Sequence, residues 1–174
     1  WLNEGGQSAA GAAIDQLLSL HPATPEARAL AQAAGKPFPV YLADRAVAAA
    51  GGASEAIRLA DRLHVVPEFL GNRAPLANPH ARALIAGLGM ESDLDNLVAL
   101  YVAGLSGVAY GLRQIIEVQA QAGAPVGAIA ISGGAGQLDL IRQLLADATG
   151  TPVIATAAEE PVLLGASILG GVAA

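Results

Sequence analysis

Hydrophobic and polar positions alternate along the chain with a spacing that changes several times, and each change predicts a boundary between elements. Apolar residues recur mostly at helical spacing over residues 8–20, and the polar segment HPATPE then interrupts them. Thr24 followed by Pro25 is typical of an N-cap and a first helical position, so we expect a second helix that ends near Gly35. A third helix is expected over residues 40–50, because two glycines follow it.

The middle of the chain contains a polar loop and then the longest periodic segment. The runs LHVV and ALIAGL predict two short strands on either side of a loop rich in proline and asparagine. Over residues 94–121, apolar residues recur three and four apart, which predicts one long helix. The carboxylates at its start, Asp93 among them, are better explained as helix caps than as a catalytic pair. Gly104, Gly107 and Gly111 predict that a neighbouring backbone approaches this helix closely.

The last third of the chain alternates between strand and helix patterns. We expect a strand at GAIAIS, a helix over residues 137–149, a strand at PVIAT and a helix over residues 161–170. Such an order predicts parallel strands with right-handed crossovers, and therefore a helix-rich α/β protein. Glu159 and Glu160 precede the last helix, where the helix dipole favours negative charge, so we expect them to be structural.

Composition narrows the function classes. The 174 residues suit one domain, and 53% are hydrophobic with only 3% aromatic, so the core must consist of small and branched aliphatics. The net charge of −6 and the single lysine disfavour a nucleic-acid partner. No apolar run of membrane-spanning length or signal peptide is present, and cysteine is absent, so a cytoplasmic protein without a membrane partner is expected. His21, His64 and His80 share no metal-ligand spacing, so no metal site is expected.

The sequence ISGGAGQL leaves two interpretations open for its glycine pair, Gly133 and Gly134. The pair either only permits a tight turn after a strand or leaves bare backbone where a nucleotide can approach a helix N-terminus. A Walker A loop is excluded, because it needs Gly-Lys-Ser/Thr and the only lysine is Lys36. A Rossmann fingerprint fails too, because its third glycine would fall at Asp139, or its second at Ala135.

Four separated motifs carry a resemblance to a known family. The segment ISGGAGQLDLIRQLLADATGTPVIATAAEEPVLLGASILGGVA resembles the C-terminal end of FGGY carbohydrate kinases, which have an actin-like fold. The segments WLNEGGQSAAGAAIDQLL, HVVPEFLGNRAPLANPHARALIAGLG and LYVAGLSGVAYGLRQIIE are most similar to pentulose kinases of the D-ribulokinase and ribitol-kinase type. The resemblance covers nearly the whole chain, with residues 23–62 the least diagnostic part.

This resemblance implies an α/β fold, namely the actin-like (ribonuclease H-like) C-terminal lobe with a mixed sheet and flanking helices, as a single domain over residues 1–174. Such kinases bind ATP, Mg²⁺ and sugar in a cleft between two lobes. The catalytic base and the first phosphate loop belong to the N-terminal lobe, and the second phosphate loop precedes the segment that matches Trp1. We therefore expect no catalytic residue in this chain, the N-terminal lobe as its partner, and no kinase activity of the chain alone.

By the same resemblance, Gly133, Gly134 and Ala135 form the adenosine-binding turn. The family often has an asparagine three residues beyond the position of Ala135, and here that residue is Leu138, which cannot donate a hydrogen bond to a base. Gln137, next to it, is the candidate substitute. Base specificity is thus the point at which this chain departs from the family pattern.

A second group of residues matches cleft segments of the family. Asn72 and Arg73 lie in a loop that faces the cleft, where an arginine could contact phosphate; alternatively, Arg73 forms a surface ion pair. Gln7, in EGGQS, could line the sugar or phosphate region, or this segment could simply cap a helix start.

Two functions of different classes therefore remain. The first is the nucleotide-binding lobe of an ATP-dependent pentulose or pentitol kinase, and the second is a non-catalytic actin-like module that binds nucleotide or a partner. A Rossmann-type dehydrogenase fails on its glycine spacing. Without the other lobe, an exposed apolar cleft face would favour self-association, so a homodimer of the chain is expected in that case.

Overall fold

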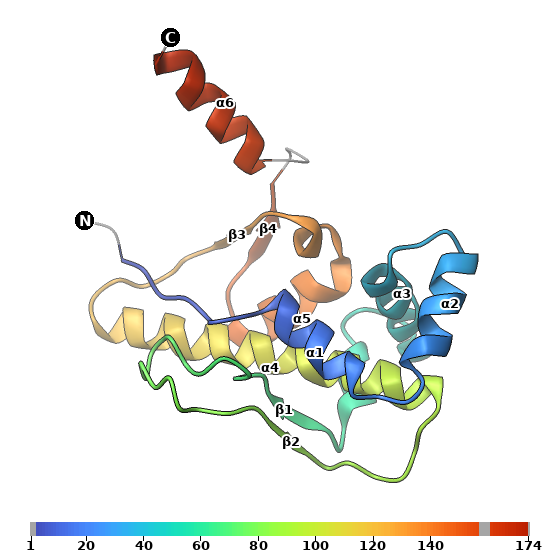
Figure 1. The fold of residues 1–174 in the computed structure, drawn as a ribbon. Helices are drawn as coiled ribbons and strands as arrows, with labels where there is room; N and C mark the ends of the chain where they lie inside the picture. Colours follow the sequence, from blue (N-terminus) through green and yellow to red (C-terminus); the bar gives the residue numbers. More distant parts are fainter. Residues whose placement is uncertain (1–2, 157–160, 174) are drawn as a thin grey trace.

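Helix α4, Leu94–Gln121, runs through the centre of the molecule, and most other elements pack around it (Figure 1). The structure is a computed structural model that describes residues 3–156 and 161–173. The remaining helices are α1 Gly11–Ser19, α2 Thr24–Ala33, α3 Phe38–Ala50, α5 Asp139–Thr149 and α6 Pro161–Ala173, with short 3-10 helices at Ala56–Ala60 and Gly134–Gln137. The strands are β1 His64–Val66, β2 Leu84–Ala86, β3 Ile129–Ile131 and β4 Val153–Ala155.

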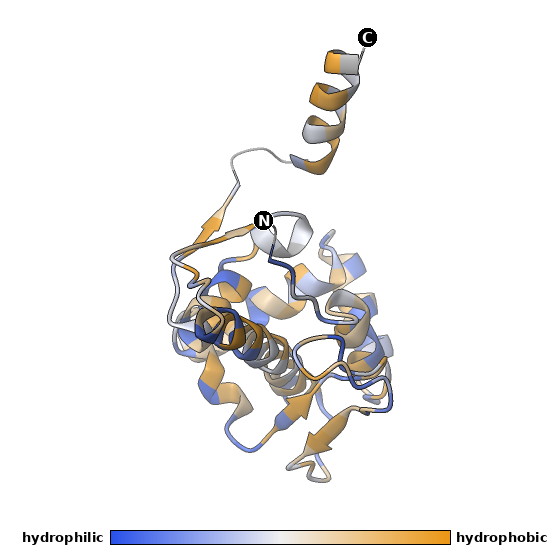
Figure 2. Cartoon of the chain, turned by 90° about the vertical axis from the view of Figure 1, so that its left-hand side faces the viewer, coloured by the Kyte–Doolittle hydropathy of each residue, from blue (hydrophilic) through white to orange (hydrophobic). Residues whose placement is uncertain are grey.

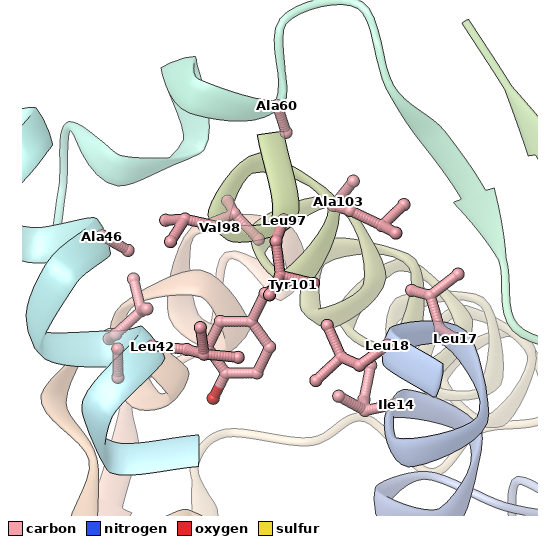
Figure 3. Close-up of a cluster of buried hydrophobic side chains, with 14 of the residues drawn as sticks. Ile14, Leu17, Leu18, Leu42, Ala46, Ala60, Leu97, Val98, Tyr101 and Ala103 are labelled. Atoms are coloured by element: carbon pink, nitrogen blue, oxygen red, sulfur yellow. The ribbon is translucent and has the colours of Figure 1, made fainter. Parts of the chain in front are cut away.

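The main core forms where α1, α2 and α3 pack on the first half of α4 (Figure 3). Leu17, Leu42, Leu97 and Tyr101 are almost completely buried there. Burial raises the pKa of the Tyr101 phenol far above its ordinary value, and its hydroxyl donates to the Pro39 carbonyl oxygen at 3.3 Å. Apart from Tyr101 and Phe38, this core consists of aliphatic side chains, as the composition predicts.

The predicted close approach of a neighbouring backbone to α4 is confirmed at Gly107, whereas side chains approach Gly104 and Gly111. A Cβ added at Gly107 would lie 2.2 Å from the Val65 carbonyl oxygen, so strand β1 rests directly on the helix backbone. At Gly104 the nearest atom would be Leu17 Cδ2, at 2.5 Å, and at Gly111 it would be Gln7 Nε2, at 2.3 Å. Each glycine therefore admits a different segment of the chain.

Of the helix ends predicted from the sequence, those at Asp93 and Gly51 are confirmed and the one at Thr24 is not. The Asp93 side chain accepts from the Asn96 amide at 2.8 Å, and α3 ends at Gly51 with φ of +80°, as expected. The predicted N-cap role of Thr24 is wrong, because Ala23 precedes the helix and no side chain caps it. Thr24 is buried instead, and its hydroxyl donates to the Leu18 carbonyl oxygen.

The described strands form two separate pairs. β1 and β2 are antiparallel, with Val65 opposite Ile85, whereas β3 and β4 are parallel, with Ala130 opposite Ile154. Helix α5 connects the parallel pair, as the alternating pattern predicts, and packs against α4 through Ala109, Leu145 and Ala148. The expected α/β class is thus present, but the expectation of a mixed sheet is wrong for the described strands, because the parallel and antiparallel pairs belong to two separate sheets.

Helix α6 extends away from the rest of the molecule (Figures 1 and 2). Its sequence, PVLLGASILGGVA, contains no charged residue. The side chains that are more than half exposed are Val162, Leu163, Leu164, Ile168, Leu169 and Val172. At 3.6 residues per turn these positions surround the helix, which is typical of a helix that is buried on all sides in its complete protein.

Among the described residues, one helix, α4, is long and apolar enough to cross a membrane. More than half of its most apolar window, 56%, is buried inside the protein, where it supports the core. A central core helix passes the same test of length and composition.

Candidate functional site

The glycine turn, residues 133–138, connects the end of β3 to the start of α5. Gly133 has φ of +85°, a left-handed conformation that a residue with a side chain rarely adopts, and its carbonyl oxygen accepts from the Gly136 amide at 3.0 Å. A 3-10 helix, Gly134–Gln137, follows, so α5 begins at Asp139 rather than at the predicted residue 137. The expected strand–turn–helix arrangement is confirmed, and Ala135 lies within the 3-10 helix.

The glycines of this turn serve different purposes. At Gly136, an added Cβ would lie 3.2 Å from both Cγ2 and the carbonyl oxygen of Ile131, so its small size is needed for packing. At Gly133 and Gly134, an added Cβ would meet no atom within 4 Å. Gly133 is explained by its positive φ, whereas Gly134 has neither a positive φ nor an atom of the described residues within 4 Å of an added Cβ, a property that it shares with Gly127.

Arg142 and Leu138, which follow the glycines in sequence, hold the turn against the rest of the protein. Arg142, on α5, donates to the Gly136 carbonyl oxygen and also pairs with Asp139. Leu138 packs against the main core, whereas Gln137 is exposed. Sequence reasoning missed Arg142, although its position three residues after Asp139 on a helix was the available signal.

A cavity of about 520 Å³ adjoins this turn. One side is formed by α3 and the other by Gln137, Leu138 and the first residues of α5. Of the glycine turn, only Gln137 and Leu138 line this cavity, and Gly133, Gly134 and Ala135 do not. Within residues 3–156 and 161–173, no three His, Asp or Glu side chains form a group that could hold a metal ion.

The second group of predicted residues, Gln7, Asn72 and Arg73, lies elsewhere. Gln7 Nε2 donates to the Val108 carbonyl oxygen of α4 at 2.7 Å. Asn72 is buried, and its Nδ2 donates to Glu68 Oε1 at 2.7 Å while its Oδ1 accepts from the Leu76 amide at 2.9 Å. Both carboxamides therefore hold segments of this chain together.

Arg73 makes the surface ion pair that was the alternative to a cleft contact. Its Nη2 lies 2.6 Å from Glu4 Oε1, and both side chains are more than 60% exposed. The alternative that EGGQS caps a helix start is wrong, because no side chain caps α1, and Ser8 Oγ instead donates to the Gly71 carbonyl oxygen at 2.8 Å. In the part of the chain that the structure describes, no hydrogen bond, ion pair or cavity joins this group to the glycine turn.

The larger cavity, of about 720 Å³, lies between η1 (Ala56–Ala60), β1 and α4. It is lined by Gln7 and by no residue of the glycine turn. Its arginines are already engaged, because Arg58 pairs with Glu55 at 2.9 Å and Arg113 with Glu117 at 2.7 Å. Size alone therefore does not decide between the two cavities.

Comparison with known proteins identifies the family of this chain. The whole chain, residues 1–174, matches the FGGY family of carbohydrate kinases, C-terminal domain. The chain belongs to this family. An FGGY carbohydrate kinase domain-containing protein of Danio rerio is 37% identical over 99% of this chain and 32% of its own length. A D-ribulokinase of Saccharomyces cerevisiae is 35% identical over 99% of this chain and 25% of its own length. The chain thus spans about a quarter to a third of these FGGY relatives.

Solved structures of FGGY kinases share the fold. A xylulose kinase from Rhodospirillum rubrum aligns with a TM-score of 0.62 and 25% identity over 88% of this chain and 27% of its own. A xylulose kinase from Brucella ovis aligns with a TM-score of 0.65 at 19% identity, over 88% of this chain and 27% of its own, which shows the fold alone. The predicted FGGY resemblance and the actin-like α/β fold are therefore confirmed.

Proposed function

We propose that this chain is the nucleotide-binding C-terminal lobe of an ATP-dependent carbohydrate kinase, a phosphotransferase that acts on a sugar or polyol hydroxyl. The observation that carries the proposal is the open backbone at Gly134, in a turn whose last residues, Gln137 and Leu138, line a cavity. Family membership supplies the chemistry, because FGGY kinases are carbohydrate kinases. Gly133, Gly134 and Ala135 bind the adenosine, and Arg142 holds their turn in place.

Phosphoryl transfer requires in-line positioning of the reactants and neutralisation of the phosphate charge. Mg²⁺ supplies charge neutralisation when it is bound with ATP. Residues of this chain orient the nucleoside and exclude water from one side of it, whereas the catalytic base and both phosphate loops belong to the rest of the kinase. Alone, the chain is therefore inactive. We also propose that residues 1–174 form a single domain, which is this lobe of the kinase.

Helix α6 supports the N-terminal lobe as the partner. Its apolar side chains are exposed on all sides, and Ile154 on β4 is 58% exposed as well. Such surface needs to be covered, and the relatives are three to four times as long as this chain, which leaves ample sequence to cover it. Without that cover, we propose that the same surface drives self-association into a homodimer.

The substrate class follows from the named relatives. One is a D-ribulokinase and two structural neighbours are xylulose kinases, so we propose a pentulose or a related polyol as the acceptor, phosphorylated in the cytoplasm. Gln7, which lies against α4 near Val108 and Gly111, and Arg73 are the residues of this chain that we propose to face the sugar or phosphate, with Asn72 supporting their loop.

The test is isothermal titration of the folded chain with Mg-ADP, beside Gly134→Val and the matched control Gly127→Val. Gly127 precedes β3, at the other end of the strand from the turn, and an added Cβ there also meets no atom within 4 Å. We expect saturable binding by the wild type and by Gly127→Val, and at least about a tenfold loss for Gly134→Val.

A second stage adds the N-terminal lobe of the kinase. Pentulose-dependent ATP consumption in the mixture, with none from either part alone, is the expected result. If the folded chain binds no nucleotide alone or in the mixture, the glycine pair is only a turn, and a non-catalytic interaction module becomes the better conclusion.

A further inference from the structure

We infer that two copies of this chain associate through strand β2, whose free edge pairs antiparallel with the same edge of the second copy across a two-fold axis at Ala86. The inference goes beyond the proposed function, because it concerns neither the nucleotide nor the sugar. It is also separate from association through α6, because β2 and α6 lie on opposite sides of α4 (Figure 1).

Strand β2, Leu84–Ala86, has a partner on one side. It pairs with β1, with Val65 opposite Ile85, and no other strand of the described residues pairs with it. The described backbone hydrogen bonds outside helices and strand pairs include none to β2. Figures 1 and 2 place the strand at the lower edge of the molecule. Because an edge strand presents unpaired N–H and C=O groups, β2 is a template for a further strand.

The surface around this edge is apolar. Val66 lies opposite Leu84, and both side chains are exposed, whereas Val65 between them in the alternation is buried on the side of α4. Leu88 and Met90, which follow β2, are exposed as well. A pair of strands is marginally stable alone, and a third and fourth strand from a second copy would give Leu84 an apolar cross-strand neighbour.

The charges that flank this segment favour a second copy as the occupant. Residues 83–90 carry no charge, and Arg82 precedes them while Glu91 follows them. Arg82 Nη1 donates to the carbonyl oxygens of Pro79 and Ala81, but among the described residues neither Arg82 nor Glu91 forms an ion pair. Antiparallel self-pairing turns Arg82 of each copy toward Glu91 of the other, whereas parallel pairing would bring like charges together.

The same charges place the two-fold axis. Ala86 and Gly87 lie midway between Arg82 and Glu91. Directly opposite residues of an antiparallel pair point to the same face, so a two-fold axis between identical strands passes through one residue, and Ala86 is the one within β2. In this register Leu84 lies opposite the partner's Leu88.

The first experiment reverses the flanking charges and measures the dimer dissociation constant by sedimentation velocity over a concentration series. All variants carry Leu163→Lys, which places a charge on exposed α6 and so suppresses association through that helix. We expect Arg82→Glu and Glu91→Arg each to raise the dissociation constant about tenfold or more, and the double variant to recover most of that loss. Recovery cannot come from the carbonyl contacts of Arg82, because the double variant lacks them too. If the double variant does not recover, the antiparallel pairing is wrong.

The second experiment places a charge on the strand itself. Leu84→Lys opposes pairing at an edge, and Leu20→Lys, after α1, is the matched control, because the two leucines are 57% and 58% exposed. In the same Leu163→Lys background we expect at least about a tenfold rise in the dissociation constant for Leu84→Lys and no change for Leu20→Lys. Circular dichroism of both variants establishes that they are folded.

The third experiment locates the axis by disulfide formation. The chain contains no cysteine, so a single introduced cysteine can form only an intermolecular disulfide. Under mild oxidation we expect Ala86→Cys to cross-link two copies rapidly, because a disulfide needs Cα atoms within about 7 Å, and Ala49→Cys, exposed on α3, to cross-link slowly. If the Leu163→Lys chain stays monomeric at every concentration, or Ala86→Cys cross-links no faster than Ala49→Cys, this inference is wrong. The proposed function is tested separately by nucleotide titration and stands in either case.

Discussion

The two groups of predicted site residues differ in what their polar atoms already do. Gln7, Asn72 and Arg73 carry the chemistry that sequence motifs favour, yet each is bonded to another part of this chain. The glycine turn presents bare backbone at Gly134, where an added Cβ would meet no atom of the described residues within 4 Å, and one exposed carboxamide, Gln137. The comparison teaches that a side chain suited to binding can be fully engaged in holding the fold.

The strongest test of this contrast is Asn72→Ala. The substitution leaves Glu68 and the Leu76 amide without their buried partner, so we expect a loss of about 1 to 3 kcal/mol in the free energy of unfolding. Urea denaturation measures it, with Asn78→Ala as the control, because the Asn78 side chain accepts a single exposed hydrogen bond from the His80 amide. An unchanged stability would mean that Asn72 is not a structural residue.

A smaller effect separates two glycines of the turn. Gly136→Ala brings a methyl group to 3.2 Å from Ile131, so we expect it to destabilise the fold by about 1 kcal/mol. Gly134→Ala meets no atom and should leave stability unchanged while weakening Mg-ADP binding. Thermal unfolding and titration, run on both variants, distinguish packing from ligand contact. Equal stability losses would contradict the assignment.

The smallest effect on stability is expected for the ion pair between Arg73 and Glu4. Because Arg73 and Glu4 are both mostly exposed, a double-mutant cycle of Arg73→Gln and Glu4→Gln should give a coupling energy below about 1 kcal/mol. That coupling should fall further as salt is raised, because ions screen exposed charges. A large, salt-independent coupling would show that the pair is a structural clamp and would remove Arg73 from the candidate cleft residues.

Much of the fold could be predicted because its signals are local. The bounds of α4 follow from the spacing of its apolar residues and the cap at Asp93, and the parallel pair β3–β4 follows from the strand–helix alternation. Thr24 was predicted wrongly because the Leu18 carbonyl oxygen, six residues away, competes for its hydroxyl. The start of α5 shifted because the glycines first form a 3-10 helix.

The candidate site was only partly predictable, because only part of it carries a local sequence signal. The glycine pair is such a signal, whereas the residues around it are brought together by tertiary packing. Helix α3 lies about ninety residues before the turn whose cavity it lines, and no pattern in its own sequence indicates that contact. The bond from Arg142 to the Gly136 carbonyl depends on how the turn folds back over α5.

The three glycines on α4 also constrain which sequences can share this fold. Because Gly104 receives α1, Gly107 receives β1 and Gly111 receives the segment around Gln7, a larger residue at each position displaces a different part of the chain. No single compensating change elsewhere can relieve all three. Each such substitution must instead be accommodated by its own neighbour, and the cost should be greatest at Gly107, where that neighbour is the backbone of β1 and not a side chain.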